Sequence, residues 1–247
     1  MRTTVPMDKV QIIIQARMTS TRLPGKVMLP LCGKPVLQVM LERLERWHSN
    51  VIVATTNDGS EAPIVDLCKS LGIAYFQGST EDVLGRYYLA ATKFGAKEDT
   101  AIVRLTSDCP LIDCDLVSQA INTYLNNDFD AVSLGPHSGF PRGLDTAVFS
   151  YKLLQTTHEK ATSTPDREHV TLGMSKFSSY SSYVISAMED LSHYRLTLDE
   201  PDDYTAIIAI YEKMHGQIIF SFAELLLTLK KFPHLADINK HVEQKTV

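Results

Sequence analysis

Short apolar runs and helix-like periodicities alternate along the first half of the chain. Four runs rich in β-branched or aromatic residues are bounded by polar or turn-forming residues, which predicts strands at 10–14, 51–54, 74–76 and 101–105. Between them apolar positions recur every three to four residues, which predicts helices over 36–47, 64–71 and 80–95. Thr80 is predicted to cap the last of these helices, with acids in its first turn.

The pattern loosens from about residue 130. Strands are predicted at 130–134 and 147–149, strand-like segments over 180–198, and helices over 201–215 and 221–230. Strands that alternate with crossover helices predict a Rossmann-like, doubly wound and mostly parallel α/β sheet. The chain has no linker-like stretch, repeat or low-complexity tract. Residues 1–247 are therefore predicted to form one domain, with a small irregular insertion around 135–185.

Charge and cysteine content narrow the class of protein. The 24 Lys and Arg residues are outnumbered by 29 Asp and Glu residues, so the formal charge is −5 and nucleic acid is not an expected partner. The four cysteines form no CxxC pair and show no zinc-site spacing, which favours buried thiols in a reducing compartment. No apolar run is long enough for a membrane span or a signal peptide. We expect a cytoplasmic protein without a membrane partner.

The first apolar run leads directly into QARMTSTRLPGK, at residues 15–26. Arg17, Arg22 and Lys26 supply three cations in a protein whose overall charge is negative. The Pro-Gly pair favours a turn, in which Gly25 lets the backbone approach a ligand closely. The segment predicts a phosphate-binding loop for a nucleoside triphosphate. No GxxxxGK[ST] or GxGxxG pattern is present, which argues against a Walker loop and against dinucleotide binding.

Polar segments that follow other predicted strands should meet this loop, because the carboxyl ends of parallel strands share one edge of the sheet. They lie at residues 55–57, 77–80 and 106–108. Asp108 is predicted to hold Mg²⁺ on the triphosphate. Asp199 is followed closely by Pro201, so it is either a second metal ligand or the N-cap of the next helix.

Other charged residues have both functional and structural interpretations. Arg86 contacts the nucleotide or pairs with Glu81 or Asp82 along its helix. Arg104 lies within a strand, where a structural role is as well supported as a functional one. The segment FPRGLD at 140–145 offers an arginine that could receive a substrate carboxylate through two hydrogen bonds.

Together these segments resemble one family, the acylneuraminate and CMP-KDO cytidylyltransferases, and in particular its spore coat polysaccharide biosynthesis protein F branch. The matching motifs are QARMTSTRLPGK, VATTND, GSTEDVLGR, RLTSDCPLID, FPRGLD, REHVT and RLTLDEPDDY. The resemblance spans about residues 10–215 and implies the nucleotide-diphospho-sugar transferase type of fold. It also implies Mg²⁺-dependent conversion of CTP and a sugar acid into a CMP-sugar and pyrophosphate, for surface polysaccharide biosynthesis.

The resemblance also implies roles for individual residues. Catalysis falls to Arg17, Lys26 and Asp108, and Mg²⁺ binding to Asp108 and Asp199. Nucleotide binding falls to Arg17, Arg22, Gly25, Lys26, Gly78, Ser79 and Arg86. Binding of the sugar acid falls to Arg142, Asp145, Arg167 and His169. A homodimer is implied as well, with 135–185 as its contact region.

The chemistry agrees with these residue types. When a sugar hydroxyl attacks the α-phosphorus and pyrophosphate leaves, charge builds on phosphate oxygens, so cations and a metal can provide most of the catalysis. The same loop and carboxylates also fit an enzyme of this fold that uses another triphosphate or another acceptor. A glycosyltransferase that uses a sugar nucleotide and a non-catalytic nucleotide-binding homologue are further alternatives.

Overall fold

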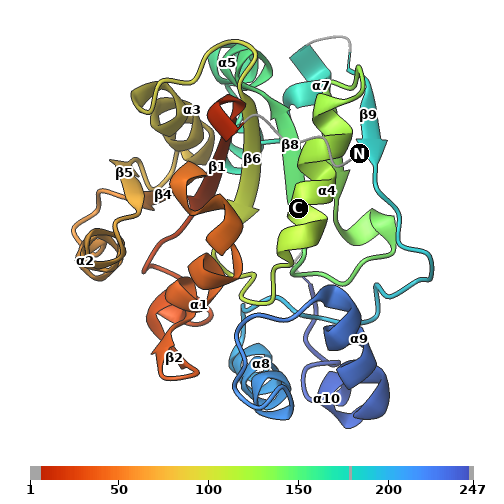
Figure 1. The fold of residues 1–247 in the computed structure, drawn as a ribbon. Coiled ribbons are helices and arrows are strands. Elements are labelled where there is room, and N and C mark those ends of the chain that lie inside the picture. The colour runs from red at the N-terminus through yellow and green to blue at the C-terminus, as the bar shows by residue number, and fades with distance from the viewer. Residues whose placement is uncertain (1–6, 178–179, 245–247) are drawn as a thin grey trace.

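The computed structural model describes residues 7–177 and 180–244, and its centre is a seven-stranded sheet in the order β5-β4-β1-β6-β8-β7-β9 (Figure 1). The strands are β1 (Val10–Gln15), β4 (Val51–Thr56), β5 (Ala74–Gly78), β6 (Ala101–Thr106), β7 (Ala131–Leu134), β8 (Thr146–Ser150) and β9 (Ser182–Val184). Neighbours from β5 to β6 are parallel, and β8 is antiparallel to both β6 and β7. The prediction of a doubly wound, mostly parallel α/β sheet is confirmed.

Helices surround this sheet. They are α1 (Val36–Arg43), α2 (Ala62–Leu71), α3 (Val83–Lys93), α4 (Cys114–Leu125), α5 (Tyr151–Lys160), α6 (Thr164–Glu168), α7 (Met174–Phe177), α8 (Pro201–Lys213), α9 (Phe222–Lys231) and α10 (His234–Asp237). The short 3-10 helices are η1 (Met7–Lys9), η2 (Lys26–Met28), η3 (Glu45–Asn50) and η4 (Pro136–Ser138), and β2 (Pro30–Leu31) pairs with β3 (Lys34–Pro35).

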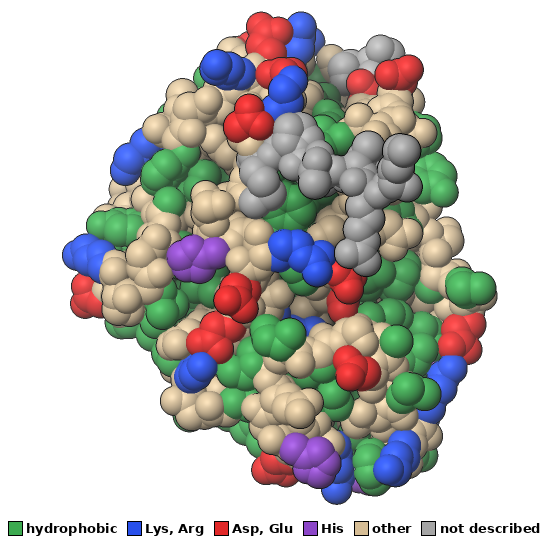
Figure 2. All heavy atoms as spheres, viewed as in Figure 1, with side chains coloured by type: hydrophobic (Ala, Val, Ile, Leu, Met, Phe, Trp, Pro, Cys, Tyr) green, Lys and Arg blue, Asp and Glu red, His purple; other side chains and the backbone are tan. Residues whose placement is uncertain are grey.

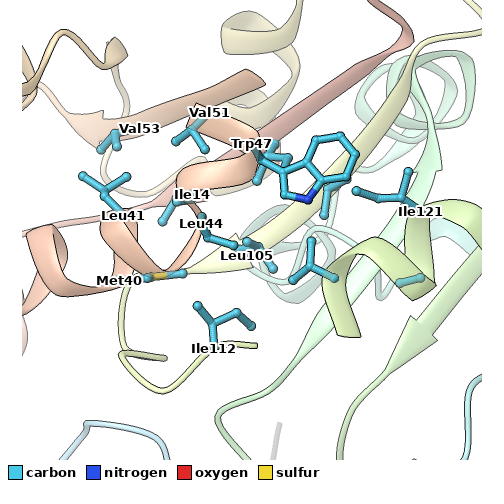
Figure 3. Close-up of a cluster of buried hydrophobic side chains, with 14 of the residues drawn as sticks. Ile14, Met40, Leu41, Leu44, Trp47, Val51, Val53, Leu105, Ile112 and Ile121 are labelled. Atoms are coloured by element: carbon cyan, nitrogen blue, oxygen red, sulfur yellow. The ribbon is translucent and has the colours of Figure 1, made fainter. Parts of the chain in front are cut away.

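One face of the sheet is covered by α1, α2 and α4. Alternate strand residues such as Ile14, Val53 and Leu105 face this layer, because successive side chains of a strand point to opposite faces. Figure 3 shows Met40 and Leu44 in this cluster beside strand residues. The central strands β1, β4 and β6 are largely buried on both faces, which explains why their sequences are continuous apolar runs.

The opposite face is covered by α3, α5 and α7, against residues such as Ile13, Ile52 and Ile102. A third cluster joins α8, α9 and α10 to the start of α1. In Figure 1 these last helices lie beyond the carboxyl ends of β1 and β6. The end of the chain is thus packed next to the edge of the sheet where the predicted site lies.

The region 135–185 differs most from the expectation. It is not an irregular insertion, since it supplies β8 and β9 to the main sheet and α5 and α7 to its core. Only Ser182–Val184 of the strand-like segment 180–198 forms a strand. The rest of that segment hydrogen-bonds to the loop before β8, as in the Leu196 N–H to Arg142 carbonyl bond of 2.8 Å. Its apolar residues pack against neighbours outside a sheet, and the sequence pattern alone does not separate the two cases.

Two smaller expectations are also corrected. The N-cap of α3 is Asp82, which accepts the Gly85 N–H at 2.8 Å, whereas the Thr80 hydroxyl donates to Asp58. Cys32 is exposed in the β2–β3 turn and not buried, although all four cysteines are free.

The surface agrees with the mixed charge of the sequence. On the face drawn in Figure 2, basic and acidic side chains are interspersed and no continuous basic patch is visible. In the described part of the chain, no helix combines the length and the apolar character that crossing a bilayer requires.

Candidate active site

The predicted phosphate loop begins where β1 ends and closes on itself through Gly25. The Gly25 N–H donates to the Met18 carbonyl at 2.9 Å, and Gly25 has a φ of +67°. Residues with a Cβ rarely adopt this left-handed conformation, so glycine suits the position. The next residue is Lys26, the first of η2. The turn therefore sets the point from which the Lys26 side chain leaves the loop.

Lys26 connects the loop to both predicted metal ligands. Its Nζ lies 3.2 Å from Asp108 Oδ2 and 2.9 Å from Asp199 Oδ1, and it donates to the Leu198 carbonyl at 2.8 Å. Burial by itself would lower the pKa of Lys26, but the two carboxylates outweigh it and the pKa is raised. Burial likewise opposes ionisation of Asp108, yet Lys26 holds the pKa of that carboxyl below its usual value.

Asp199 faces the loop and does not cap α8. The N-cap of α8 is Glu200, and Asp203 accepts the backbone N–H groups of Asp199 and Glu200 at 2.9 and 3.0 Å. The Asp199 carboxylate is therefore left to the cations around it. Of the two interpretations of Asp199, the structure excludes the capping role.

Further arginines surround Asp199. Arg22 lies 3.1 Å from Asp199 and 3.2 Å from Glu200, so a second predicted phosphate ligand contacts the same carboxylate as Lys26. Arg195 lies 3.4 Å from Asp199 and binds Asp203 at 2.8 Å. The sequence analysis did not single out Arg195. Its place four residues before Asp199 and eight before Asp203, in a segment predicted as strand, gave no sign that the three would meet.

The residues present fit a divalent cation bound together with phosphate. The Lys26 ammonium is a stand-in for such an ion, because it already brings two carboxylate oxygens to one positive charge. Among the described residues no group of three His, Cys, Asp or Glu side chains is placed to hold a metal. Mg²⁺ commonly binds through one or two carboxylates and completes its shell with waters and substrate phosphates. Asp108 and Asp199 are the two carboxylates that would hold it.

The segment after β5 forms a second part of the site. Arg86 is buried, donates from Nη1 to the Ser79 carbonyl at 2.8 Å, and lies near enough to Arg17 for the two charges to interact. A Cβ on Gly78 would lie 3.2 Å from Arg86 Cγ and 2.8 Å from the Phe76 ring. Glycine at 78 thus makes room for the arginine. The alternative pairing of Arg86 along its helix is not formed, since Asp82 binds Arg167 instead.

Buried polar atoms without hydrogen-bond partners gather at the carboxyl edge of the sheet. Among the described residues they include Gln15 Oε1, Thr55 Oγ1, Thr56 Oγ1 and Arg86 Nε. Gln15 and the two threonines end β1 and β4, and buried polar groups in native proteins are seldom left unpaired. A polar ligand at this edge would satisfy them. Sequence reasoning missed Gln15, although it is polar and ends an apolar run.

Arg142 and Asp145 lie in the loop before β8. The Arg142 backbone pairs with Arg195, and its guanidinium charge opposes the rise that burial causes in the pKa of Asp145. Asp145 accepts the Gly143 N–H at 2.8 Å. Burial raises the pKa of Asp145, and the nearby Asp108 adds to this effect. Both residues precede β8, which pairs with β6 on the side opposite to β1.

Arg167 is engaged elsewhere. Its Nε donates to Asp82 Oδ1 at 2.9 Å, its Nη2 to Asp82 Oδ2, and its Nη1 to the His158 carbonyl at 2.8 Å. These bonds connect α6 to the start of α3. His169 follows the same helix and is partly buried. Contact of Arg167 and His169 with a sugar stays a prediction, and the observed bonds of Arg167 favour a positioning role.

The sequence of this chain is similar to those of known proteins. A protein-family model described as cytidylyltransferase matches residues 11–226. The chain belongs to the cytidylyltransferase family. This cytidylyltransferase is 30% identical to the spore coat polysaccharide biosynthesis protein SpsF of Bacillus subtilis strain 168, over 93% of the chain and 98% of that protein. The resemblance drawn from the motifs is confirmed.

Solved structures agree. A cytidylyltransferase from Leptospira borgpetersenii superposes with a TM-score of 0.87 at 31% identity, covering 96% of this chain and 99% of the other. A CMP:2-keto-3-deoxy-manno-octonic acid synthetase complexed with CTP superposes with a TM-score of 0.62 at 18% identity, covering 83% and 99%. The second likeness concerns the fold alone. This cytidylyltransferase is thus a nucleotidyltransferase with the Rossmann-like fold of its relatives.

Proposed function

We propose that this enzyme converts CTP and a sugar acid into a CMP-sugar and pyrophosphate, with Mg²⁺, for surface polysaccharide biosynthesis. The observation that carries the proposal is the contact of Lys26 with both Asp108 and Asp199. It places the cationic loop and two carboxylates around one point at the carboxyl edge of the sheet. Membership of the cytidylyltransferase family and the likeness to SpsF support the nucleotide and the pathway class.

The mechanism follows from the charge that develops. Arg17, Arg22 and Lys26 bind the triphosphate and neutralise the oxygens of the departing pyrophosphate. Arg86, with Gly78 and Ser79, positions the nucleoside beside this loop. Mg²⁺, held by Asp108 and Asp199, would supply further charge neutralisation when bound. Arg142 and Asp145 orient the sugar so that its hydroxyl oxygen attacks the α-phosphorus in line with the leaving group.

Arrival of the nucleotide must rearrange the loop. In the structure Lys26 and Arg22 are neutralised by carboxylates, so neither is free to bind phosphate. Asp108 and Asp199 would hold a divalent cation that accompanies the triphosphate. Lys26 and Arg22, released from these carboxylates, would then bind the phosphates. We expect the metal and the nucleotide to bind together for this reason.

Pyrophosphate release tests the function. With CTP, Mg²⁺ and a panel of sugar acids, Asp108→Asn should lower kcat by about 100-fold or more, the scale of losing one group that stabilises transition-state charge. Asp115→Asn is the matched control, since that side chain is 74% exposed and pairs with Arg46 at the surface. Release with UTP or GTP but not CTP would overturn the nucleotide assignment. Binding of CTP without release for any acceptor would favour a non-catalytic homologue.

The proposal includes a cytoplasmic homodimer. Its contact is expected in the region 135–185, where β9 is the edge strand of the sheet and exposes Tyr183 and Val184. A mass of twice 27.6 kDa in light scattering would agree with this assembly.

A further inference from the structure

Arg104 of β6 and Asp145, just before β8, carry opposite charges and form no ion pair with each other. Ile102 of β6 belongs to the face covered by α3 and α5, so Arg104, two residues later, emerges from the same face. Arg104 pairs in register with Ala147 of the antiparallel strand β8. Asp145 precedes Ala147 by two residues and shares that face, toward the carboxyl end of β6. Both side chains therefore emerge near the end of β6 that leads to Asp108.

Neither Arg104 nor Asp145 forms an ion pair with any of the described residues. Among the described residues the Arg104 guanidinium forms no hydrogen bond or ion pair, and its Nε is buried without a partner. Asp145 accepts one hydrogen bond, from the Gly143 N–H at 2.8 Å, and also has no ion pair in the described chain. Burial raises the pKa of Asp145, and the charge of Arg142 and, to a smaller extent, that of Arg104 oppose this rise. An unpaired buried guanidinium nitrogen is costly unless a ligand completes it.

The position of Arg104 and Asp145 relative to the predicted nucleotide-binding segments indicates which substrate they would contact. The phosphate loop follows β1, and the Gly78–Arg86 segment follows β5, two strands away on the β4 side. Arg104 and Asp145 belong to β6 and to the loop entering β8, on the other side of β1. Asp108 follows β6, so it lies between the nucleotide-binding segments and the Arg104–Asp145 pair along the edge of the sheet. The nucleotide would occupy the β5–β1 half of the edge, which leaves the β6–β8 half for the acceptor.

Resting on the proposed function, we infer that Arg104 selects an anionic acceptor, with its guanidinium bound to the sugar carboxylate while Asp145 accepts a hydrogen bond from a hydroxyl of the same sugar. The planar guanidinium presents paired N–H groups that match a carboxylate. Arg167 is not available for this task, because Asp82 and the His158 carbonyl occupy its donors. A sugar acid carries both an anion and hydroxyl donors, so it can satisfy both members of the pair.

The pair also explains how a neutral sugar would be rejected. A site built to bind a polar group discriminates strongly against an analogue that lacks it, because its own buried groups then stay unpaired. A sugar without the carboxylate would leave Arg104 Nε as it is in the structure. Arg104 is therefore a specificity-determining residue, and its removal should weaken discrimination more than nucleotide use.

The experiment measures discrimination between a sugar acid and its neutral analogue. Pyrophosphate release from CTP is followed with the best acid of a panel that includes 3-deoxy-manno-octulosonate and N-acetylneuraminate, and with the same sugar whose carboxylate is reduced to hydroxymethyl. Arg104→Met should lower the ratio of kcat/KM between acid and neutral analogue by about 10- to 100-fold, the value of a charged hydrogen bond. The KM for CTP should stay within about twofold. Arg104→Lys should restore part of the ratio.

Controls separate this role from a structural one. Arg46→Met removes an exposed arginine that pairs with Asp115. It should change neither the acid-to-neutral ratio of kcat/KM nor the melting temperature. If Arg104→Met folds poorly, Asp145→Asn is the second variant to measure. It should raise the KM for the sugar acid and leave the KM for CTP unchanged. An unchanged acid-to-neutral ratio in Arg104→Met would overturn the inference and leave the proposed function standing. Absence of release from CTP with every sugar would instead refute the proposed function.

Discussion

At the scale of single residues, one lysine dominates the site. Lys26 makes three polar contacts, two with carboxylates and one with a backbone carbonyl, and its side chain is only 12% exposed. A buried cation of this kind holds two carboxylates close together that would otherwise repel each other. The same cation is the predicted ligand of the triphosphate. We therefore expect Lys26 to serve two states of the enzyme, and its substitution to affect them in opposite directions.

Replacement of Lys26 by Met should free Asp108 and Asp199 for a divalent cation while removing a phosphate ligand. We expect Mn²⁺ to bind the nucleotide-free variant more tightly than the parent protein, as measured by electron paramagnetic resonance of the free ion. The kcat/KM for CTP should fall by about 100-fold. Lys34→Met is the control, because Lys34 pairs with Glu42 at the surface. Equal Mn²⁺ affinity in parent and variant would show that Lys26 does not compete with the ion.

At the scale of elements, helix ends organise the site. Asp82 caps α3 through the Gly85 N–H and also binds Arg167 from α6. Asp203, in the first turn of α8, accepts the N–H groups of Asp199 and Glu200. In both cases the carboxylate at the helix N-terminus also binds an arginine, which lies 85 positions away for Asp82 and eight positions away for Asp203. Each helix start thus fixes the geometry of a loop that carries predicted site residues.

The Arg167–Asp82 pair distinguishes the two roles considered for Arg167. Arg167→Met should lower the free energy of unfolding by about 1–2 kcal/mol, because Asp82 and two backbone carbonyls lose a donor. The KM for the sugar acid should stay within about twofold. Thermal unfolding and steady-state kinetics measure the two quantities, with Arg46→Met as the matched surface variant. A large rise in that KM at unchanged melting temperature would instead place Arg167 at the sugar.

At the scale of the whole molecule, the C-terminal segment forms hydrogen bonds with residues that position the site. Asn239 is 1% exposed and donates to the Arg195 carbonyl at 3.0 Å and to Asp203 Oδ1 at 2.8 Å. Arg43 of α1 likewise donates to the carbonyls of Ile112 and Phe220, which connects α1 to the loop before α4 and to the segment before α9. The family model ends at residue 226, before Asn239. The C-terminal helices therefore belong to the structure that positions Asp199.

Asn239→Ala should weaken the enzyme at a distance. Loss of two buried hydrogen bonds should cost about 2 kcal/mol in the free energy of unfolding. The loosened Asp203 should misplace Asp199 and lower kcat about tenfold, since small displacements of aligned groups reduce rates strongly. Asn127→Ala is the control, because Asn127 is exposed and bonds only within its own helix end. Full activity of a destabilised Asn239 variant would separate the C-terminal packing from the site.

The sequence by itself determined the parallel half of the sheet and the place of the first loop and of Asp108 at its carboxyl edge. Apolar runs and helical periodicity are local signals, and they located β1, β4 and β6, whose two faces are largely buried, as well as the partly exposed edge strand β5. The region 135–185 was harder, since β8 enters the sheet antiparallel and β9 joins from a distant segment. Those pairings depend on neighbours far along the chain.

Only the tertiary structure decided which charges meet. Asp199 lies 173 positions from Lys26 and Asp108 lies 82 positions away, yet all three share one contact. It also assigned Arg167 to Asp82 and left Arg104 Nε without a hydrogen-bond partner among the described residues, although the two arginines look equally polar in the sequence. Charge interactions act over a few ångströms of space and leave no periodic trace along the chain. Their pairing is therefore settled by packing, after the local pattern has formed the elements.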